Sequence, residues 1–251
     1  MPATMSRREC TMPHSEWFKN MRQLGLTFPD TYVVFDLETT GLFFDIDYIV
    51  QFGHLVVENC VPRQPIATTL DWINAPGVNL DHFYSRLADV IARFPGYRFN
   101  AQRIVQEGVD PLAVVQIYYD MLKDHQDAGG YFVTHNGIAY DAPMCVEHFK
   151  RFLGKDFEFN LDHIVDTGML AKAAQIDKYP YGNESMTSFY KRIKDIRSKQ
   201  QWKLTPICVD RYQLNDRLDL DMRGAHTAGF DCLLTHLLAE RFRNLSLGFE
   251  A

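Results

Sequence analysis

The sequence predicts a mixed α/β domain whose five-stranded sheet is flanked by helices. Three stretches rich in β-branched and aromatic residues follow one another between residues 31 and 73, which suggests three strands joined as a meander. After residue 79, segments with apolar residues at helical spacing alternate with short strand-like stretches, as in mixed α/β domains. Since no repeat or linker interrupts the chain, we expect one domain over residues 31–251, preceded by an extension over residues 1–30.

The composition is that of an ordinary globular chain. It has 251 residues, of which 46% are hydrophobic and 23% charged, which excludes a disordered or collagen-like protein. The apolar runs are far shorter than the roughly 20 residues of a membrane-spanning helix, and no secretory signal is expected at the N-terminus. The five cysteines are scattered without a CxxC pair, so no disulfide framework or cysteine zinc site is expected. We therefore expect an intracellular, cytoplasmic protein with no membrane partner.

The first part of the chain is expected to contain one helix and then strands. Trp17, Phe18 and Met21 have helical spacing in a short segment between His14 and Leu24. The β-rich stretches that follow are separated by turn residues such as Gly41, Asn59 and Pro62. The predicted strands cover residues 31–37, 48–57 and 66–73.

Helices dominate the rest of the chain. Asp110 followed by Pro111 is a typical helix start, with a capping aspartate and a proline in the first turn, and the Gly129-Gly130 pair ends that helix. The other predicted helices cover residues 79–94, 142–153, 167–175, 184–199 and 227–242. Two further strands are predicted over residues 131–134 and 160–165.

Asp36 and Glu38 end the first predicted strand. Residues two apart in a strand point to the same face, so these two carboxylates project together. They repel each other unless a cation lies between them, and hard divalent ions such as Mg²⁺ and Mn²⁺ prefer carboxylate oxygens. A solvated, inert pair at a strand end is the alternative interpretation.

Two further acidic motifs follow. Asp141 comes after the strand and turn that contain His135 and Asn136, where an aspartate could simply cap a helix. Asp231 lies at the edge of the apolar stripe of the last helix, where a carboxylate is costly unless paired or bound to a metal. His226 precedes it by five residues and is expected in a loop or first turn.

These motifs together resemble one known family. The order Asp-x-Glu, His-Asn-x4-Asp and His-x4-Asp is similar to that of the DEDDh group of 3′–5′ exonucleases, the DnaQ-like exonucleases, which have a ribonuclease H-like fold. The related DEDDy group would carry tyrosine where this chain has Thr227. Residues 47–53 and 165–167 resemble the second and fifth strands of the family. The segments 76–96 and 184–215 look enlarged.

The resemblance implies a site and a reaction. Asp36, Glu38, Asp141 and Asp231 would hold two Mg²⁺ ions, which Mn²⁺ may replace, and His226 would act as the general base. Water would attack the terminal phosphodiester of DNA or RNA and release a nucleoside 5′-monophosphate. Around the end of the strand, Thr39 and Thr40 would face the terminal nucleotide, Leu42 would wedge against its base, and Asn136 would support the strand. The implied partner is a nucleic acid with a free 3′ end, in single-stranded form.

A basic segment was a candidate for the path of the strand. Residues 190–203 contain six basic residues and one acidic residue, against a net charge of −6 for the whole chain. Tyr190 and Trp202 flank these charges and could stack on bases. A solvated helix face is the alternative interpretation.

Three other functions stay open at this level. An oligoribonuclease-like, RNA-trimming enzyme of the same family would use the same motifs, because discrimination depends on contacts to the 2′-hydroxyl. A nucleic-acid-binding module that has lost catalysis would also keep the fold, although all five motif residues are present here. A polymerase partner or self-association is a further alternative, and Trp17 and Phe18 could then dock a partner or pack on their own domain.

Overall fold

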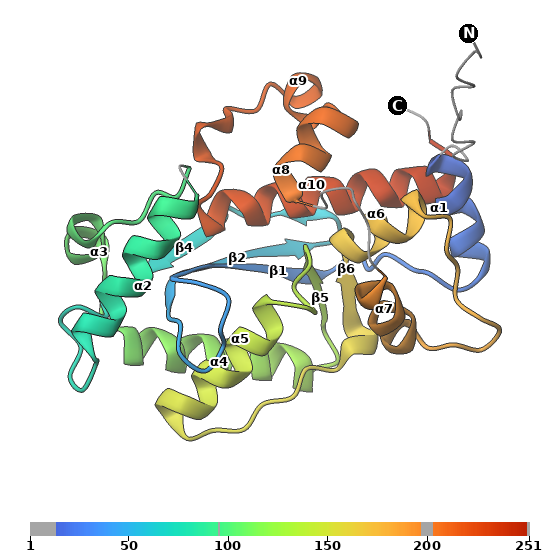
Figure 1. Ribbon diagram of the computed structural model, residues 1–251. Coiled ribbons are helices and arrows are strands. Elements are labelled where there is room, and N and C mark those ends of the chain that lie inside the picture. Colours follow the sequence, from blue (N-terminus) through green and yellow to red (C-terminus); the bar gives the residue numbers. More distant parts are fainter. Residues whose placement is uncertain (1–13, 95, 197–202, 250–251) are drawn as a thin grey trace, which may run out of the picture.

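A mixed sheet forms the centre of the molecule (Figure 1). The computed structural model describes residues 14–94, 96–196 and 203–249. Its sheet has the order β3-β2-β1-β5-β6, with β4 also paired to β2. The strands are β1 (Tyr32–Thr39), β2 (Ile49–Glu58), β3 (Val61–Pro62), β4 (Ile66–Thr69), β5 (Tyr131–Thr134) and β6 (Ile164–Asp166).

The pairing gives five strand positions. β1 pairs with β2 antiparallel along its whole length, so β3 and β4 share the other edge of β2. β5 is parallel to β1, and β6 is parallel to β5. The predicted meander and the predicted class of a mixed α/β sheet flanked by helices are therefore confirmed, and the short β3 is a sixth strand that the sequence did not predict.

Helices cover both faces of this sheet. Helix α10 (Ala228–Leu247) crosses one face, and α4 (Pro111–Asp127) and α5 (Asp141–His148) lie on the other (Figure 1). Two neighbouring residues of β2, Phe52 and Gly53, face opposite sides of the sheet. Phe52 stacks on Tyr118 of α4 with ring centroids 3.6 Å apart, whereas a Cβ at Gly53 would lie 2.4 Å from the backbone of Ala228. Only glycine lets the start of α10 approach the sheet so closely.

Helix α1 (His14–Gln23) is part of this packing. Its apolar residues Trp17, Phe18 and Met21 are buried. Phe18 stacks on Phe242 of α10 at 4.4 Å between ring centroids, and Trp17 donates to the carbonyl oxygen of Lys178. Trp17 and Phe18 thus pack within this chain. No helix in the described part of the chain is both long enough and apolar enough to span a membrane.

The remaining helices include several that the sequence predicts and some that it does not. The predicted cap of α4 is confirmed, since the side chain of Asp110 accepts from the amide of Leu112. Helix α2 is also capped, by the side chain of Asn79, which accepts from the amide of His82. The set comprises α2 (Leu80–Arg93), α3 (Ala101–Glu107), α6 (Thr167–Gln175), α7 (Met186–Asp195), α8 (Leu204–Pro206) and α9 (Leu214–Leu218), with short 3₁₀ or π turns at Phe149–Leu153, Leu161–His163, Ile207–Arg211 and Met222–Gly224.

One helix and several boundaries differ from the prediction. Helix α3 was not predicted. The predicted strand over residues 160–165 begins only at Ile164, because Asn160 caps a 3₁₀ turn that occupies Leu161–His163. The predicted helix over residues 184–199 ends at Asp195, and its last residues, from 197 onward, lie outside the described part.

Candidate active site

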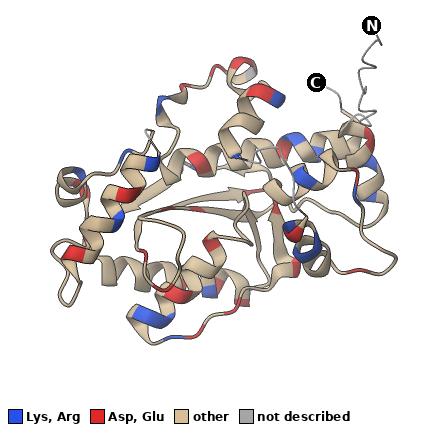
Figure 2. Cartoon of the chain, viewed as in Figure 1, with Lys and Arg blue, Asp and Glu red and all other residues tan. Residues whose placement is uncertain are grey.

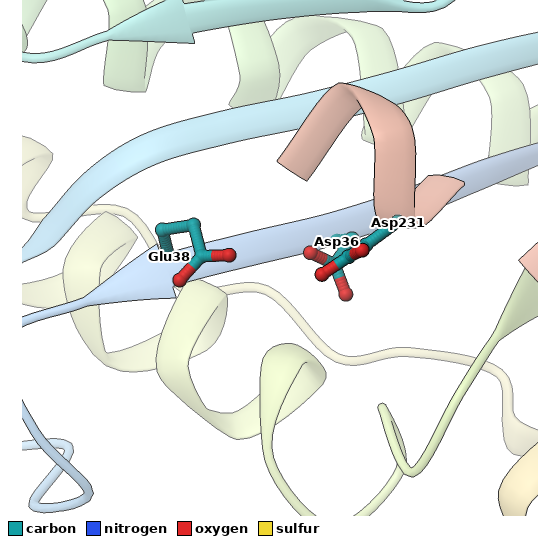
Figure 3. A group of neighbouring side chains, drawn as sticks. All are labelled: Asp36, Glu38 and Asp231. Carbon is teal, nitrogen blue, oxygen red and sulfur yellow. The ribbon is translucent and has the colours of Figure 1, made fainter. Parts of the chain in front are cut away.

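Three carboxylates meet where β1 ends and α10 begins. Asp36 and Glu38 project from β1 on the face that α10 covers, and Asp231 comes from the first turn of α10 (Figure 3). Each offers an oxygen that lies within 4.8 Å of the others. The close approach at Gly53 produces this meeting, because Gly53 is the register partner of Asp36. We call Asp36, Glu38 and Asp231 the acidic group.

The acidic group is electrostatically unfavourable without a cation. Burial raises the pKa of Asp36 well above its usual range, and the charges of Asp141, Asp231 and Glu38 raise it further. Burial and the charges of Asp231 and Asp141 raise the pKa of Glu38 to about 8. Burial raises the pKa of Asp231 to about 7, although the backbone of His226 and the charge of Arg98 oppose this rise. Among the described residues, the buried Oδ1 of Asp231 finds no hydrogen-bond partner.

Asp141 lies beside the acidic group. It is the first residue of α5, is 4% exposed, and its charge acts on both Asp36 and Glu38. Tyr140 takes the N-cap position, and within the described structure no side chain caps this helix, so Asp141 is not the capping residue that its sequence context allowed. Burial and the charge of Asp166 raise its pKa to about 8.

His226 stands at the edge of the same site. It precedes α10 in a left-handed backbone conformation with φ of 63°, and its backbone hydrogen-bonds to Asp231. Its ring packs against Gly96, where a Cβ would lie 3.1 Å from Cδ2 of the imidazole. Burial lowers the pKa of His226, and the charges of Arg98 and Lys203 lower it further, so the imidazole is neutral at neutral pH.

A cleft of about 670 Å³ opens next to these groups. Glu38, Asp231 and His226 line it, together with all four residues that sequence analysis assigned to the substrate. Those four are Thr39, Thr40, Leu42 and Asn136. Leu42 is mostly exposed.

Residues that the sequence did not single out hold one wall of the cleft. The hydroxyl of Tyr97 donates to the carbonyl oxygen of Thr39 at 2.9 Å, and the hydroxyl of Tyr140 contacts Thr39 Oγ1 and the carbonyl oxygen of Gly41. These bonds fix the turn after β1. No sequence motif marked either tyrosine, since their roles arise from tertiary contacts.

Asp47 anchors the loop that follows this turn. Its buried carboxylate accepts from Arg86 of α2 through two nitrogens, at 2.7 and 3.0 Å, and from Thr40 Oγ1 and the amide of Phe43. The bonds from Arg86 and the amide of Phe43 hold the pKa of Asp47 below its usual range, against the opposing effect of burial. In the sequence, Asp47 is marked only as the first residue of the stretch 47–53 that resembles a strand of the family.

The basic segment over residues 190–203, which contributes the blue residues of α7 in Figure 2, is placed differently from the prediction. Tyr190 is buried and its hydroxyl accepts from the amide of Asp166, so it cannot stack on a base. Arg192 is paired with Glu184 at 2.6 Å. Lys191 lines a second groove, of about 770 Å³, that contains no residue of the acidic group. Of the basic residues of this segment that the structure describes, Lys203 lines the cleft. Trp202 lies outside the described residues.

The fold is shared with known nucleases. The chain superposes on Escherichia coli exonuclease I in complex with a dA16 oligonucleotide with a TM-score of 0.57 and 14% identity, over 88% of this chain and 42% of that chain. The zinc-bound form of the exonuclease I complex with single-stranded DNA gives a TM-score of 0.55 at 14% identity, over 86% of this chain and 42% of that one. The chain thus spans less than half the length of exonuclease I.

A sequence match points the same way. A 143-residue stretch, 57% of this chain, is 26% identical to the PolC-type DNA polymerase III of Ureaplasma parvum and covers 8% of that protein. No model of a protein family matches the sequence. This chain therefore has the fold of exonuclease I, a mixed α/β sheet flanked by helices, in agreement with the fold that the acidic motifs imply.

Proposed function

We propose that this chain is a 3′–5′ exonuclease that depends on divalent metal ions and removes nucleotides from single-stranded ends. The observation that carries the proposal is the acidic group, whose half-buried carboxylates converge beside a cleft and include a buried Oδ1 of Asp231 that has no hydrogen-bond partner among the described residues. The exonuclease I complexes with single-stranded DNA support the substrate class, since they share this fold.

The residues of the acidic group suit a divalent cation. Carboxylate oxygens are the ligands of Mg²⁺ and Mn²⁺, and the unpartnered Oδ1 of Asp231 is a buried polar atom that a cation would satisfy. Asp36, Glu38 and Asp231 would hold the ions, with Asp141 completing the set. Bound ions would supply an activated water and stabilise the charge on the phosphate and on the leaving 3′-oxygen.

The protein's own groups would do the rest. His226 is neutral at neutral pH, so a ring nitrogen of its imidazole can accept the proton of the attacking water. The turn at Thr39 and Thr40 would hold the terminal nucleotide, because Tyr97 and Tyr140 fix its backbone. Leu42 would contact the terminal base, and Asn136, which also lines the cleft, would support the strand. The product would be a nucleoside 5′-monophosphate.

Two alternatives to a DNA exonuclease remain as candidates. An RNA-trimming, oligoribonuclease-like enzyme would use the same acidic group, and comparison of DNA and RNA substrates separates the two. A silent binding module is disfavoured, because a protein that only binds nucleic acid has no need to bury unpaired carboxylates at its cleft. A polymerase partner and self-association are separate proposals that no contact described above requires.

The polarity of attack tests the proposal. A linear single-stranded oligonucleotide labelled at its 5′ end should shorten one nucleotide at a time with Mg²⁺, for DNA, RNA or both. A 3′-phosphate or a circular strand should resist, because the cleft beside Thr39 and Leu42 receives a free end. Rapid cutting of the circle would identify an endonuclease, and binding without any cutting would identify the silent module.

A further inference from the structure

The two segments that look enlarged in the sequence meet at the mouth of the cleft. Helix α2 belongs to residues 76–96, and Lys203 and α8 belong to residues 184–215. Figure 1 shows α2 and α8 on either side of the start of α10. Both contribute to the cleft lining, α2 through Arg86, Val90, Arg93 and Phe94, and the other segment through Lys203, Leu204, Thr205 and Pro206.

Their contact combines an aromatic ring with positive charges. The ammonium group of Lys203 lies 5.6 Å from the centre of the Phe94 ring, and the Phe94 side chain is 45% exposed although it lines the cleft. Arg93 precedes Phe94 in the chain. Its side chain is 58% exposed, and its Nη2 atom lies 3.6 Å from Oδ2 of Asp89. These three side chains form what we call the outer wall of the cleft.

The outer wall continues directly from the catalytic end. Gly96 follows Phe94 closely in the chain and packs against the ring of His226, and the charge of Lys203 acts on that ring as well. The outer wall therefore lies next to His226 and the acidic group. A strand whose 3′ end lies at the acidic group can therefore place its next nucleotides on this wall.

We propose that the outer wall is a subsite for the nucleotides just upstream of the scissile bond, with Phe94 stacking on an unpaired base and with Lys203 and Arg93 contacting phosphates. The proposal rests on the function proposed above. Exposed aromatic rings beside basic groups are the elements that bind single strands without sequence preference. A base must be unpaired to stack on Phe94, so the subsite selects single-stranded ends.

The test separates stacking from charge. Binding of a 5′-fluorescein-labelled dT10 strand is measured by anisotropy in EDTA, for the unmodified chain and for Phe94→Ala, Phe94→Trp, Lys203→Ala and Lys191→Ala. Phe94→Ala should weaken binding about tenfold, within the range measured for base stacking on aromatic rings, and Phe94→Trp should restore it. Lys203→Ala should weaken binding. It should also lower the slope of log Kd against log salt by about the amount that one phosphate contact contributes. Lys191→Ala, in the second groove, should change neither quantity.

An abasic scan locates the stacked base. Strands with one abasic position among the first four nucleotides from the 3′ end should show one position at which the loss of the base weakens binding to the unmodified chain. That position should no longer matter in Phe94→Ala. An identical scan for both chains, or equal effects of Lys203→Ala and Lys191→Ala, would overturn the proposal. If the unmodified chain neither binds nor shortens any strand, the proposed function itself fails.

Discussion

Carboxylates are withdrawn from solvent at two neighbouring places in the molecule. At one place they accept hydrogen bonds from backbone amides, and at the other they face one another. Asp166, at the end of β6, is fully buried, and its oxygens accept from the amides of Asn136, Ile138 and Met169 at 2.9 to 3.1 Å. Asp231 has an oxygen without a partner among the described residues and faces Asp36 and Glu38. Burial raises the pKa of both, to about 6 for Asp166 and about 7 for Asp231.

The hydrogen-bond partners of Asp166 and Asp231, rather than their burial, indicate which of the two carboxylates has a structural role. The backbone donors around Asp166 stabilise its charged form and tie the turn at Asn136 to the start of α6. The acidic group has other carboxylates as neighbours where Asp166 has amides. A fold gains no stability from such an arrangement, so we interpret it as a site that a cation completes.

The largest expected effect comes from neutralising one carboxylate of each kind. Asp36→Asn should abolish detectable exonuclease turnover, because it removes a proposed metal ligand. It should also raise the melting temperature of the metal-free protein by about 2–4 °C for each kcal/mol of repulsion relieved. Asp166→Asn should lower the melting temperature, because the new amide leaves a buried backbone donor unpaired at a cost of about 1–3 kcal/mol. Thermal unfolding in EDTA measures both shifts, and shifts of the same sign would contradict the distinction.

A smaller effect is expected at His226. His226→Ala should lower kcat by about 10²–10⁴-fold, the range for loss of a general base, while the stabilisation by Mg²⁺ stays as in the unmodified chain. Because burial lowers the pKa of His226 from its usual 6.5, kcat of the unmodified chain at saturating Mg²⁺ should fall as the pH drops below that value. The alanine variant should lose this dependence in its pH profile. Near-normal turnover in His226→Ala would make the residue structural.

Much of the fold follows from local patterns. The residues that begin α4, Asp110 and Pro111, cap and start the helix as their types predict. Helix α3 was missed because it has seven residues and one buried apolar residue, Ile104, which gives no periodic signal. The strand predicted over residues 160–165 was misjudged because the side chain of Asn160 turns the chain before pairing begins.

The site was predictable where side-chain direction follows from a regular element. Asp36 and Glu38 share a face because of the alternation of a strand, and their carboxylates lie together with that of Asp231. The basic helix could not be placed in this way, because the packing of Tyr190 against Asp166 sets which face of α7 is buried. The outer wall could not be predicted from the sequence either, because Phe94 and Lys203 are more than a hundred residues apart in the chain.

The central claim is that the acidic group is a cation site, and the pH dependence of metal stabilisation tests it most directly. The folded-state pKa values of Glu38 and Asp231 are raised to about 8 and about 7, above those of the unfolded chain. The folded, metal-free protein therefore holds extra protons near pH 6, and its stability should fall as the pH rises to 8.

Cations must displace those protons, so their effect should grow with pH. In the protein stripped with EDTA, saturating Mn²⁺ should raise the melting temperature more at pH 8 than at pH 6, and Asp36→Asn should remove most of this rise. An equal rise at both pH values, no rise at all, or a full rise in Asp36→Asn would contradict the claim.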